Sequence, residues 1–204
     1  MFALALTFSI AGCTKQTATL PYYVDESLTP LWLDREQKSS PAFHRISEFD
    51  LVDQSGEPFT ADSLNGRVHV ASFFFATCTD VCPKTRRQLK EIARAFANDD
   101  RVLIASYSVN PERDSVAALA AFGIHNSVDH RRWRLLTGDR RTIQTVAQSY
   151  LIGTGKGADY GVDSVAHTEM IALVDQNRRI RGVYNGTLRL DTRQIIADIA
   201  ELLR

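Results

Sequence analysis

The sequence predicts an α/β fold in which one central mixed sheet carries helices on both faces. Strand-like and helix-like patterns alternate along most of the chain, and such alternation is typical of a sheet covered by helices. Residues 67–76 form a mainly apolar run, of the kind found in a strand that is buried on both faces. The length of 204 residues and the hydrophobic content of 44% fit one globular domain with a packed core.

The expected elements follow one another along the chain, each recognised by its apolar period or its turn residues. The expected strands are 49–52, 67–76, 101–109, 133–136, 168–174 and 180–184. The turn at 53–56 after the first strand predicts a small hairpin, and the turn at 175–177 predicts a hairpin of the last two strands. The expected helices are 84–98, 113–122, a segment with an apolar stripe over 143–150, and a last one with a stripe over 195–203. We expect Gly123 to end the second helix. The order of elements resembles a thioredoxin-like fold with an N-terminal hairpin and one inserted helix.

The beginning of the chain has the pattern of an export signal. Residues 1–12 are apolar and uncharged, which fits the core of a signal peptide but is too short for a permanent membrane span. They lead into Cys13, and the residues before it resemble the bacterial lipobox, in which a cysteine is lipidated and becomes the new N-terminus. We therefore expect a lipid anchor on Cys13, an irregular tether to residue 44, and a domain at 45–204 on the periplasmic side of the membrane. A buried strand with an incidental cysteine is the alternative.

Charge and cysteine content narrow the function classes. The 24 basic and 24 acidic residues balance, so the chain lacks the basic surplus of a nucleic-acid-binding protein. We therefore expect the cluster Arg131, Arg132 and Arg134 to be a solvated surface. Once Cys13 is assigned to the anchor, two of the three cysteines remain, in a compartment where disulfides persist.

Those two, Cys78 and Cys82, lie where the buried strand ends and the first long helix begins. The carboxyl edge of an α/β sheet is where ligands and reactive groups gather. Pro83 suits the first turn of a helix, so Cys82 is expected at the helix N-terminus, where the helix dipole should lower its thiol pKa. The spacing lets both sulfurs face the same way, so the pair can close a disulfide or share a metal ion. Simple packing and a structural disulfide are the alternatives, although so short a loop removes little unfolded-state entropy.

A histidine near the thiols would change their chemistry. A dithiol alone indicates redox chemistry. A dithiol with a histidine indicates a soft-metal site, because thiolates bind Cu(I), zinc or iron–sulfur clusters and an imidazole binds copper and zinc. His167 stands between a polar loop and a buried strand, where thioredoxins commonly have a cis-proline; the last proline here is Pro111. A surface histidine at a strand start is the alternative. The other histidines are expected in the leader (His44), in a core hydrogen bond (His69) and on the surface (His125 and His130).

Further segments match landmarks of one known family. They are Gly66, Phe73–Phe75, Cys78-x-x-x-Cys82-Pro83, Val109–Asp114, Trp133–Asp139 and Val165–Thr168. Together they resemble the Sco/SenC family, membrane-anchored proteins linked to copper delivery to cytochrome c oxidase, over nearly the whole chain after the anchor. Three residues depart from the family pattern: Asn110 and Ala166 replace aspartates, and Thr79 replaces a proline.

The resemblance implies a copper metallochaperone. It implies that Cys78, Cys82 and His167 bind one copper ion, as Cu(I) or Cu(II), and that the two cysteines can cycle between dithiol and disulfide. It also implies a tethered monomer whose partners are a thiol–disulfide donor and the copper-accepting subunit of a terminal oxidase. Three ligands would leave one coordination position open to the recipient.

Other functions could use the same residues. A thiol–disulfide reductase that keeps a copper acceptor's cysteines reduced needs only Cys78 and Cys82, so enzyme activity stays open, although thioredoxins have Cys-x-x-Cys. A thiol peroxidase would match Thr79 to Cys82, but Phe75 stands where that family has a proline. The third alternative is a binding module without a metal.

Overall fold

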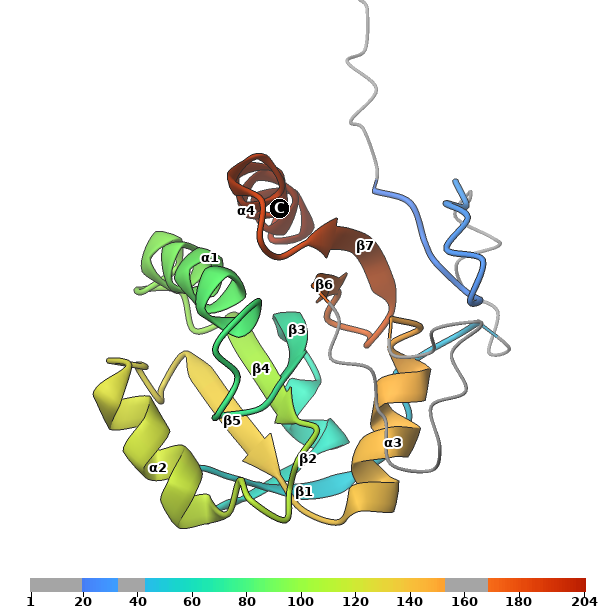
Figure 1. Cartoon of the computed structure of the whole chain (residues 1–204). Helices are drawn as coiled ribbons and strands as arrows, with labels where there is room; N and C mark the ends of the chain where they lie inside the picture. The colour runs from blue at the N-terminus through green and yellow to red at the C-terminus, as the bar shows by residue number, and fades with distance from the viewer. Residues whose placement is uncertain (1–19, 33–42, 153–168) are drawn as a thin grey trace, which may run out of the picture.

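A computed structural model of the chain describes residues 20–32, 43–152 and 169–204, which contain one seven-stranded sheet (Figure 1). The strands are β1 (Asp50–Asp53), β2 (Pro58–Thr60), β3 (Val68–Phe74), β4 (Val102–Ser108), β5 (Trp133–Thr137), β6 (Met170–Val174) and β7 (Ile180–Asn185). Their order in the sheet is β2-β1-β5-β4-β3-β6-β7. β3, β4 and β5 run parallel, and the other neighbours are antiparallel. The expected strands and both hairpins are therefore confirmed.

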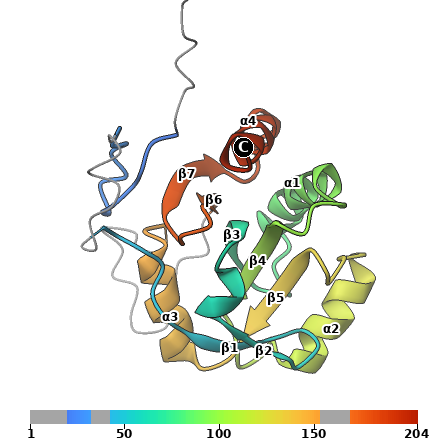
Figure 2. The same ribbon diagram turned by 180° about the vertical axis from the view of Figure 1, so that it is seen from behind.

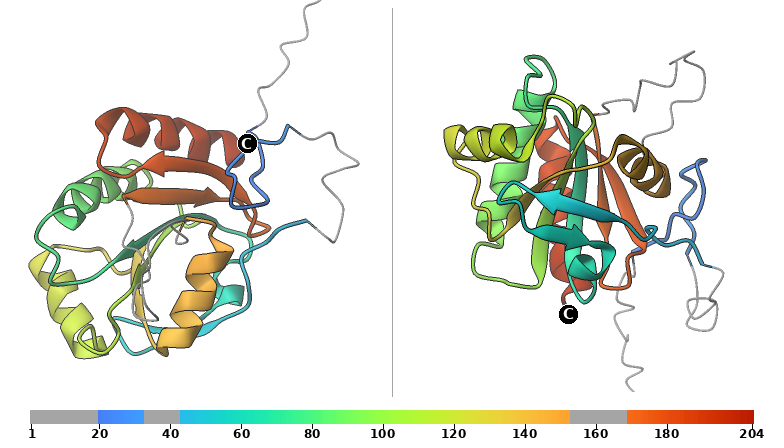
Figure 3. Two further views of the ribbon diagram at one scale, coloured as in Figure 1. Left: turned by 45° about the vertical axis from the view of Figure 1, so that its right-hand side comes forward. Right: turned by 90° about the horizontal axis from the view of Figure 1, so that it is seen from below.

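Helices cover both faces of this sheet. In the described residues they are η2 (Ala61–Leu64, a 3-10 turn that the sequence pattern does not predict), α1 (Cys82–Ala95), α2 (Val116–His125), α3 (Arg140–Ser149) and α4 (Arg189–Leu202). α1, α2 and α4 pack on one face and α3 on the other (Figure 2 and Figure 3). No helix in the described ranges has the length and apolar character needed to cross a membrane.

The strand β3 is buried along its whole length because both of its faces are covered. Successive side chains of a strand point to opposite faces. Val68 and Val70 pack in the core under α1, α2 and α4, whereas Ala71 and Phe73 pack in the core under α3. The central strand is thereby fixed from two sides, which gives the loop that follows it a rigid base.

The helix α2 differs from its prediction at both ends. It begins three residues later than expected because Ser115 caps it, with the Ser115 side chain accepting a hydrogen bond from the amide of Ala118 at 3.3 Å. It also continues through Gly123 to His125, so the expected stop at Gly123 is wrong. A Cβ at Gly123 would lie 3.5 Å from Leu135 Cδ1, so the small residue brings the helix close to β5. The glycine is a packing contact of the helix rather than its end.

The described part of the leader docks on the edge strand β7. The Arg181 guanidinium donates hydrogen bonds to the carbonyls of Pro21 at 2.9 Å and Leu20 at 2.5 Å, and it lies 3.9 Å from the centroid of the Tyr22 ring. A buried ion pair with Asp175, at 3.2 Å, holds Arg181 in place. This clasp fixes residues 20–22 to the domain.

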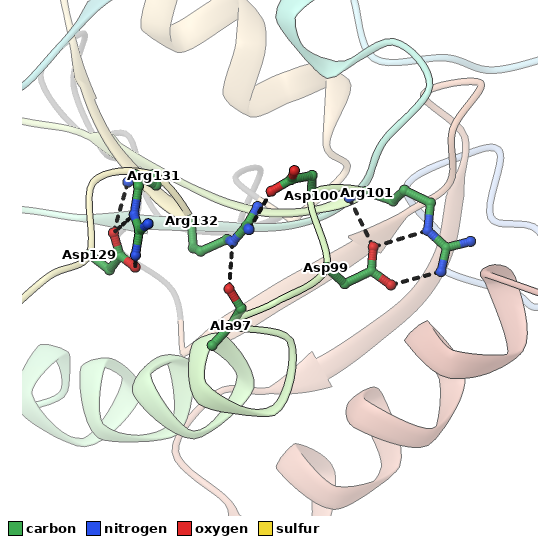
Figure 4. A network of polar contacts seen from close by, with 7 residues as sticks. All are labelled: Ala97, Asp99, Asp100, Arg101, Asp129, Arg131 and Arg132. Carbon is green, nitrogen blue, oxygen red and sulfur yellow. Dashed lines mark hydrogen bonds and ion pairs between the residues drawn. The ribbon is translucent and has the colours of Figure 1, made fainter.

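The predicted arginine cluster is neutralised by aspartates. Arg131 pairs with Asp129 and Arg132 with Asp100, as Figure 4 shows. Arg134 pairs with the buried carboxylate of Asp53 at 2.7 Å. The cluster therefore has little uncompensated positive charge. The sequence predicts a solvated surface here but not these ion pairs.

Candidate metal centre

The two predicted thiols lie in the loop between β3 and α1, at the carboxyl ends of the parallel strands. Cys82 is the first residue of α1 and Pro83 is the second, as the sequence predicts. The Cys78 amide donates to the carbonyl of Phe75 at 3.2 Å, which turns the chain back immediately after β3. Cys82 is 7% exposed and Cys78 is half-buried, and both are free thiols. The structure thus brings this pair together at the edge where reactive groups are expected.

The thiol loop is held by a buried carboxylate from the next loop along the sheet. Asp114 Oδ2 accepts hydrogen bonds from the amide of Ala76 at 2.9 Å and from the hydroxyl of Ser108 at 2.6 Å. Asp114 is 1% exposed, and its own amide donates to the carbonyl of Asn110 at 2.9 Å. The Val109–Asp114 segment is therefore a brace for the thiol loop. The sequence marked this segment but did not reveal the role of Asp114.

The pKa values of the two thiols shift in opposite directions. Burial raises the pKa of Cys82 to about 12, with a further contribution from the hydrogen bond to Cys78. Burial also acts to raise the pKa of Cys78, but the hydrogen bonds from the Cys82 thiol and from the amides of Cys82, Asp80 and Val81 outweigh it and lower that pKa below its ordinary value. The predicted lowering at Cys82 is therefore wrong. The amides around the helix start point at Cys78, so that sulfur receives the stabilisation expected for Cys82.

Behind the thiols lies a mainly apolar cavity bordered by Cys82, Phe74 and Arg86. Two serine hydroxyls and the indole of Trp133 in its wall are hydrogen-bonded to one another. The Ser106 hydroxyl lies 2.7 Å from that of Ser72 and accepts from Trp133 Nε1 at 2.8 Å. The inner side of Cys82 therefore faces a mainly apolar wall, and this burial raises the pKa of the Cys82 thiol.

None of the described histidines joins the thiols. His69 is fully buried and its Nε2 lies 2.9 Å from the Tyr150 hydroxyl, which confirms the expected core hydrogen bond. His44 Nε2 lies 2.7 Å from the carbonyl of Ser149, at the end of α3. His125 and His130 are exposed, as expected. Within residues 20–32, 43–152 and 169–204, no three side chains of the His, Cys, Asp or Glu type form a cluster able to hold a metal ion.

The remaining candidates, His167 and Cys13, lie outside the described residues. The chain from Glu169 onward is described, and β6 pairs with β3, the strand that leads into the thiol loop. β6 is antiparallel to β3 in the register Ala71–Ala172, so Met170 lies at the end of β3 that leads to the thiols.

Contacts of Glu169 and Gly186 also place the start of β6 near the first turn of α1. The amide of Gly186 donates to the carbonyl of Glu169 at 2.7 Å. A Cβ on Gly186 would come within 2.9 Å of Thr85 Cγ2, so Gly186 lies directly against the first turn of α1. Glu169 is therefore one hydrogen bond and one packing contact away from the helix turn that begins with Cys82.

Comparison with known proteins identifies the family. A family model described as SCO1/SenC matches residues 37–204. The chain belongs to the SCO1/SenC family. The SCO1 protein homolog of Bacillus subtilis (strain 168) is 27% identical over 166 residues, covering 80% of this chain and 86% of that protein.

Solved SCO1/SenC structures share the fold. A SCO1/SenC family lipoprotein from Bacillus anthracis str. Ames superposes with a TM-score of 0.68 at 27% identity, covering 78% of this chain and 95% of that chain. ScoI of Bradyrhizobium japonicum, solved with copper bound, superposes with a TM-score of 0.62 at 29% identity, covering 76% and 98%. The predicted family and its thioredoxin-like α/β fold are confirmed.

Proposed function

We propose that this protein is a copper metallochaperone that holds one copper ion with two thiolates and one imidazole, from Cys78, Cys82 and His167. The observation that carries the proposal is the free thiol pair at the carboxyl edge of β3, beside the entry of β6. The Bradyrhizobium japonicum relative was solved with copper bound, which supports the choice of metal.

The donor set suits copper on chemical grounds. Thiolates favour soft ions such as Cu(I), and an imidazole is a common ligand of both copper oxidation states. Each of the two thiols shifts the pKa of the other, so the sulfur atoms of Cys78 and Cys82 lie close together before any ion arrives. The described residues supply no third ligand, so the proposal needs one from outside them.

The position of Glu169 supports His167 as that ligand. Thr85, which packs against Gly186, lies three residues after Cys82 and so about 5 Å along the helix axis. His167 precedes Glu169 by two residues, a length of chain that spans at most about 7 Å. An imidazole at position 167 is therefore within reach of the thiols.

We further propose that the ion is passed to the copper site of a respiratory oxidase. Three ligands leave a coordination position free, and a ligand of the recipient can enter there before the ligands of the donor leave. We also propose that Cys13 carries the lipid anchor and holds the domain on the outer side of the membrane, where that oxidase site would be met.

Copper stoichiometry of the reduced protein tests the site. The full chain is kept in a neutral detergent, loaded with Cu(I) and compared with Cys78→Ser, Cys82→Ser and His167→Ala variants. We expect one copper ion per chain, lost in both serine variants and bound at least about tenfold more weakly in the alanine variant, in line with the loss of one metal ligand. A matched control is His125→Ala, which removes an exposed histidine and should leave binding unchanged.

The rate of copper transfer to a recipient protein distinguishes copper delivery from copper storage. His167→Ala that still holds copper through its thiols should pass it to an apo recipient much more slowly than the unmodified protein. Unchanged transfer would contradict the role given to His167. No copper in the unmodified protein, with a disulfide that exchanges readily with a thioredoxin-like donor, would favour the reductase alternative.

A further inference from the structure

The helix that begins with Cys82 is strongly and unusually basic for this protein. Along its 14 residues α1 carries one acidic residue, Glu91. Its basic residues are Lys84, Arg86, Arg87, Lys90 and Arg94. The whole chain has no net charge, so this surplus is local. A local field of this kind orients an approaching partner rather than attracting every anion in solution.

The cations of α1 have no acidic partner in the described residues, whereas eight arginines elsewhere do. Among the described residues, ion pairs are formed by Arg101, Arg131, Arg132, Arg134, Arg140, Arg178, Arg181 and Arg204. Figure 4 shows three of these arginines against their aspartates. No cation of α1 forms an ion pair with any residue in the described ranges. Their positive charge is therefore available to a second molecule.

Three of these cations line one groove. Arg86, Arg87 and Lys90 form its wall together with Pro83 and with Asn126 from the end of α2. Pro83 directly follows Cys82, so the groove begins beside the thiol loop.

Arg86 connects the groove with the thiols. Its guanidinium lies 5.4 Å from the centroid of the Phe122 ring, which holds the side chain between α1 and α2. The same residue borders the cavity behind Cys82. A molecule bound in the groove therefore contacts a residue that also lines the thiol cavity.

We propose that this groove is the docking site for an acidic segment of the protein that exchanges copper or electrons with Cys78 and Cys82. The inference rests on the proposed function, because such an exchange needs a protein partner in contact with the thiol loop. Carboxylates are the chemical match for a row of Arg and Lys side chains without partners of their own. An anionic membrane is the less suitable occupant, because a bilayer lying in the groove would cover the thiols.

Binding of an acidic peptide to the metal-free protein tests the groove. The full chain is reduced and inserted in phosphatidylcholine vesicles, and a fluorescein-labelled hexaglutamate peptide is titrated in at low salt, with hexalysine as the control peptide. We expect hexaglutamate to bind and hexalysine not to bind. The affinity should fall as salt is added, because exposed charges are screened.

Charge reversal locates the binding. Arg87→Glu/Lys90→Glu should weaken hexaglutamate binding at least tenfold. The matched control, Arg141→Glu/Arg193→Glu, makes the same change in charge at exposed positions of α3 and α4 and should stay within twofold. Equal circular dichroism spectra and melting temperatures show that both variants fold. Equal losses in the two variants, or no loss in either, overturn the proposal.

Anionic lipid and copper loading complete the test. Replacing part of the phosphatidylcholine by phosphatidylglycerol should leave peptide binding unchanged. A loss of peptide binding would make the anionic membrane the occupant of the groove and overturn the proposal. Copper binding by Arg87→Glu/Lys90→Glu should equal that of the unmodified protein. Since the peptide titration contains no copper, a protein that binds copper but not the peptide refutes the groove alone. A protein that binds the peptide but no copper refutes the proposed function alone.

Discussion

The two faces of the sheet use their buried polar groups differently. Under α3, the Tyr150 hydroxyl joins His69 Nε2 at 2.9 Å and the Tyr107 hydroxyl at 2.8 Å, and all three side chains are fully buried. On the side of α1 and α2, where Ser72, Ser106 and Trp133 also form buried hydrogen bonds, Asp114 ties one edge loop to another. The first network stabilises the interior, and the second shapes the reactive loop. The comparison teaches that the carboxylate that shapes the thiol loop lies on the opposite face of the sheet from the Tyr150 network.

The largest expected effect comes from removing the brace. Asp114→Ala leaves the Ala76 amide and the Ser108 hydroxyl without their acceptor in a buried place. Each orphaned group costs about 1–3 kcal/mol, so we expect a loss of about 3 kcal/mol in the free energy of unfolding, measured with urea. The thiol loop should also loosen, and Cys82 should react with iodoacetamide several-fold faster.

Asp114→Asn is the matched control for that prediction. The amide retains one acceptor oxygen and nearly the same shape, so it should lose about half as much stability. Equal thiol reactivity in Asp114→Ala and the unmodified protein would show that Asp114 stabilises the fold without shaping the thiol loop.

A smaller effect is expected at the centre of the other network. Tyr150→Phe removes the hydroxyl that both His69 and Tyr107 contact, and we expect a loss of about 2 kcal/mol in the free energy of unfolding. Iodoacetamide reactivity of the thiols should not change, since α3 lies on the opposite face. Tyr107→Phe, at the end of the network, should lose less. A change in thiol reactivity with Tyr150→Phe as large as with Asp114→Ala would remove the distinction between the faces.

An effect that is small near pH 6 and grows as the pH falls is the dependence of stability on pH. Burial, assisted by the charge of Arg178, lowers the pKa of His69 from 6.5 to about 3. The folded protein therefore keeps His69 neutral while the unfolded chain takes up a proton below pH 6.5. Stability is complete above that pH and falls as the pH falls toward 3, by at most about 1.4 kcal/mol per pH unit.

Urea unfolding at several pH values between 6.5 and 5 checks this prediction, because carboxylates titrate lower. His69→Gln removes the titrating group and should flatten the dependence in that range. The same slope in His69→Gln and the unmodified protein would assign it to other groups.

Most of the fold could be predicted from local patterns. The apolar run that predicts β3 and the stripes that predict α1, α3 and α4 report burial directly, and burial follows the period of each element. The error at Gly123 has a physical reason. A glycine can end a helix or let it approach a strand, and only the contact with Leu135 distinguishes the two. The docking of the leader through Arg181 depends on residues about 160 positions apart and has no local signal.

The candidate site was predictable in position but not in electrostatics. The spacing of Cys78, Cys82 and Pro83 correctly placed the thiols at the strand end and the helix start. It assigned the lowered pKa to the wrong sulfur, because the helix rule ignores burial and does not say where the loop amides point. Asp114 was missed because its hydrogen bond to Ala76 spans 38 positions of the chain. The only signal in the sequence was an aspartate at the end of a segment that matches the family.

The clasp of Arg181 on the leader sets how far the domain can move from its attachment. Under the proposed lipidation, Cys13 is seven positions before the docked Leu20, a length that spans at most about 25 Å when fully extended. The domain would then occupy a thin layer above the bilayer. The domain would then meet other membrane proteins by diffusion in two dimensions. Its effective concentration near them would be set by the length of chain between Cys13 and Leu20 and not by its bulk concentration.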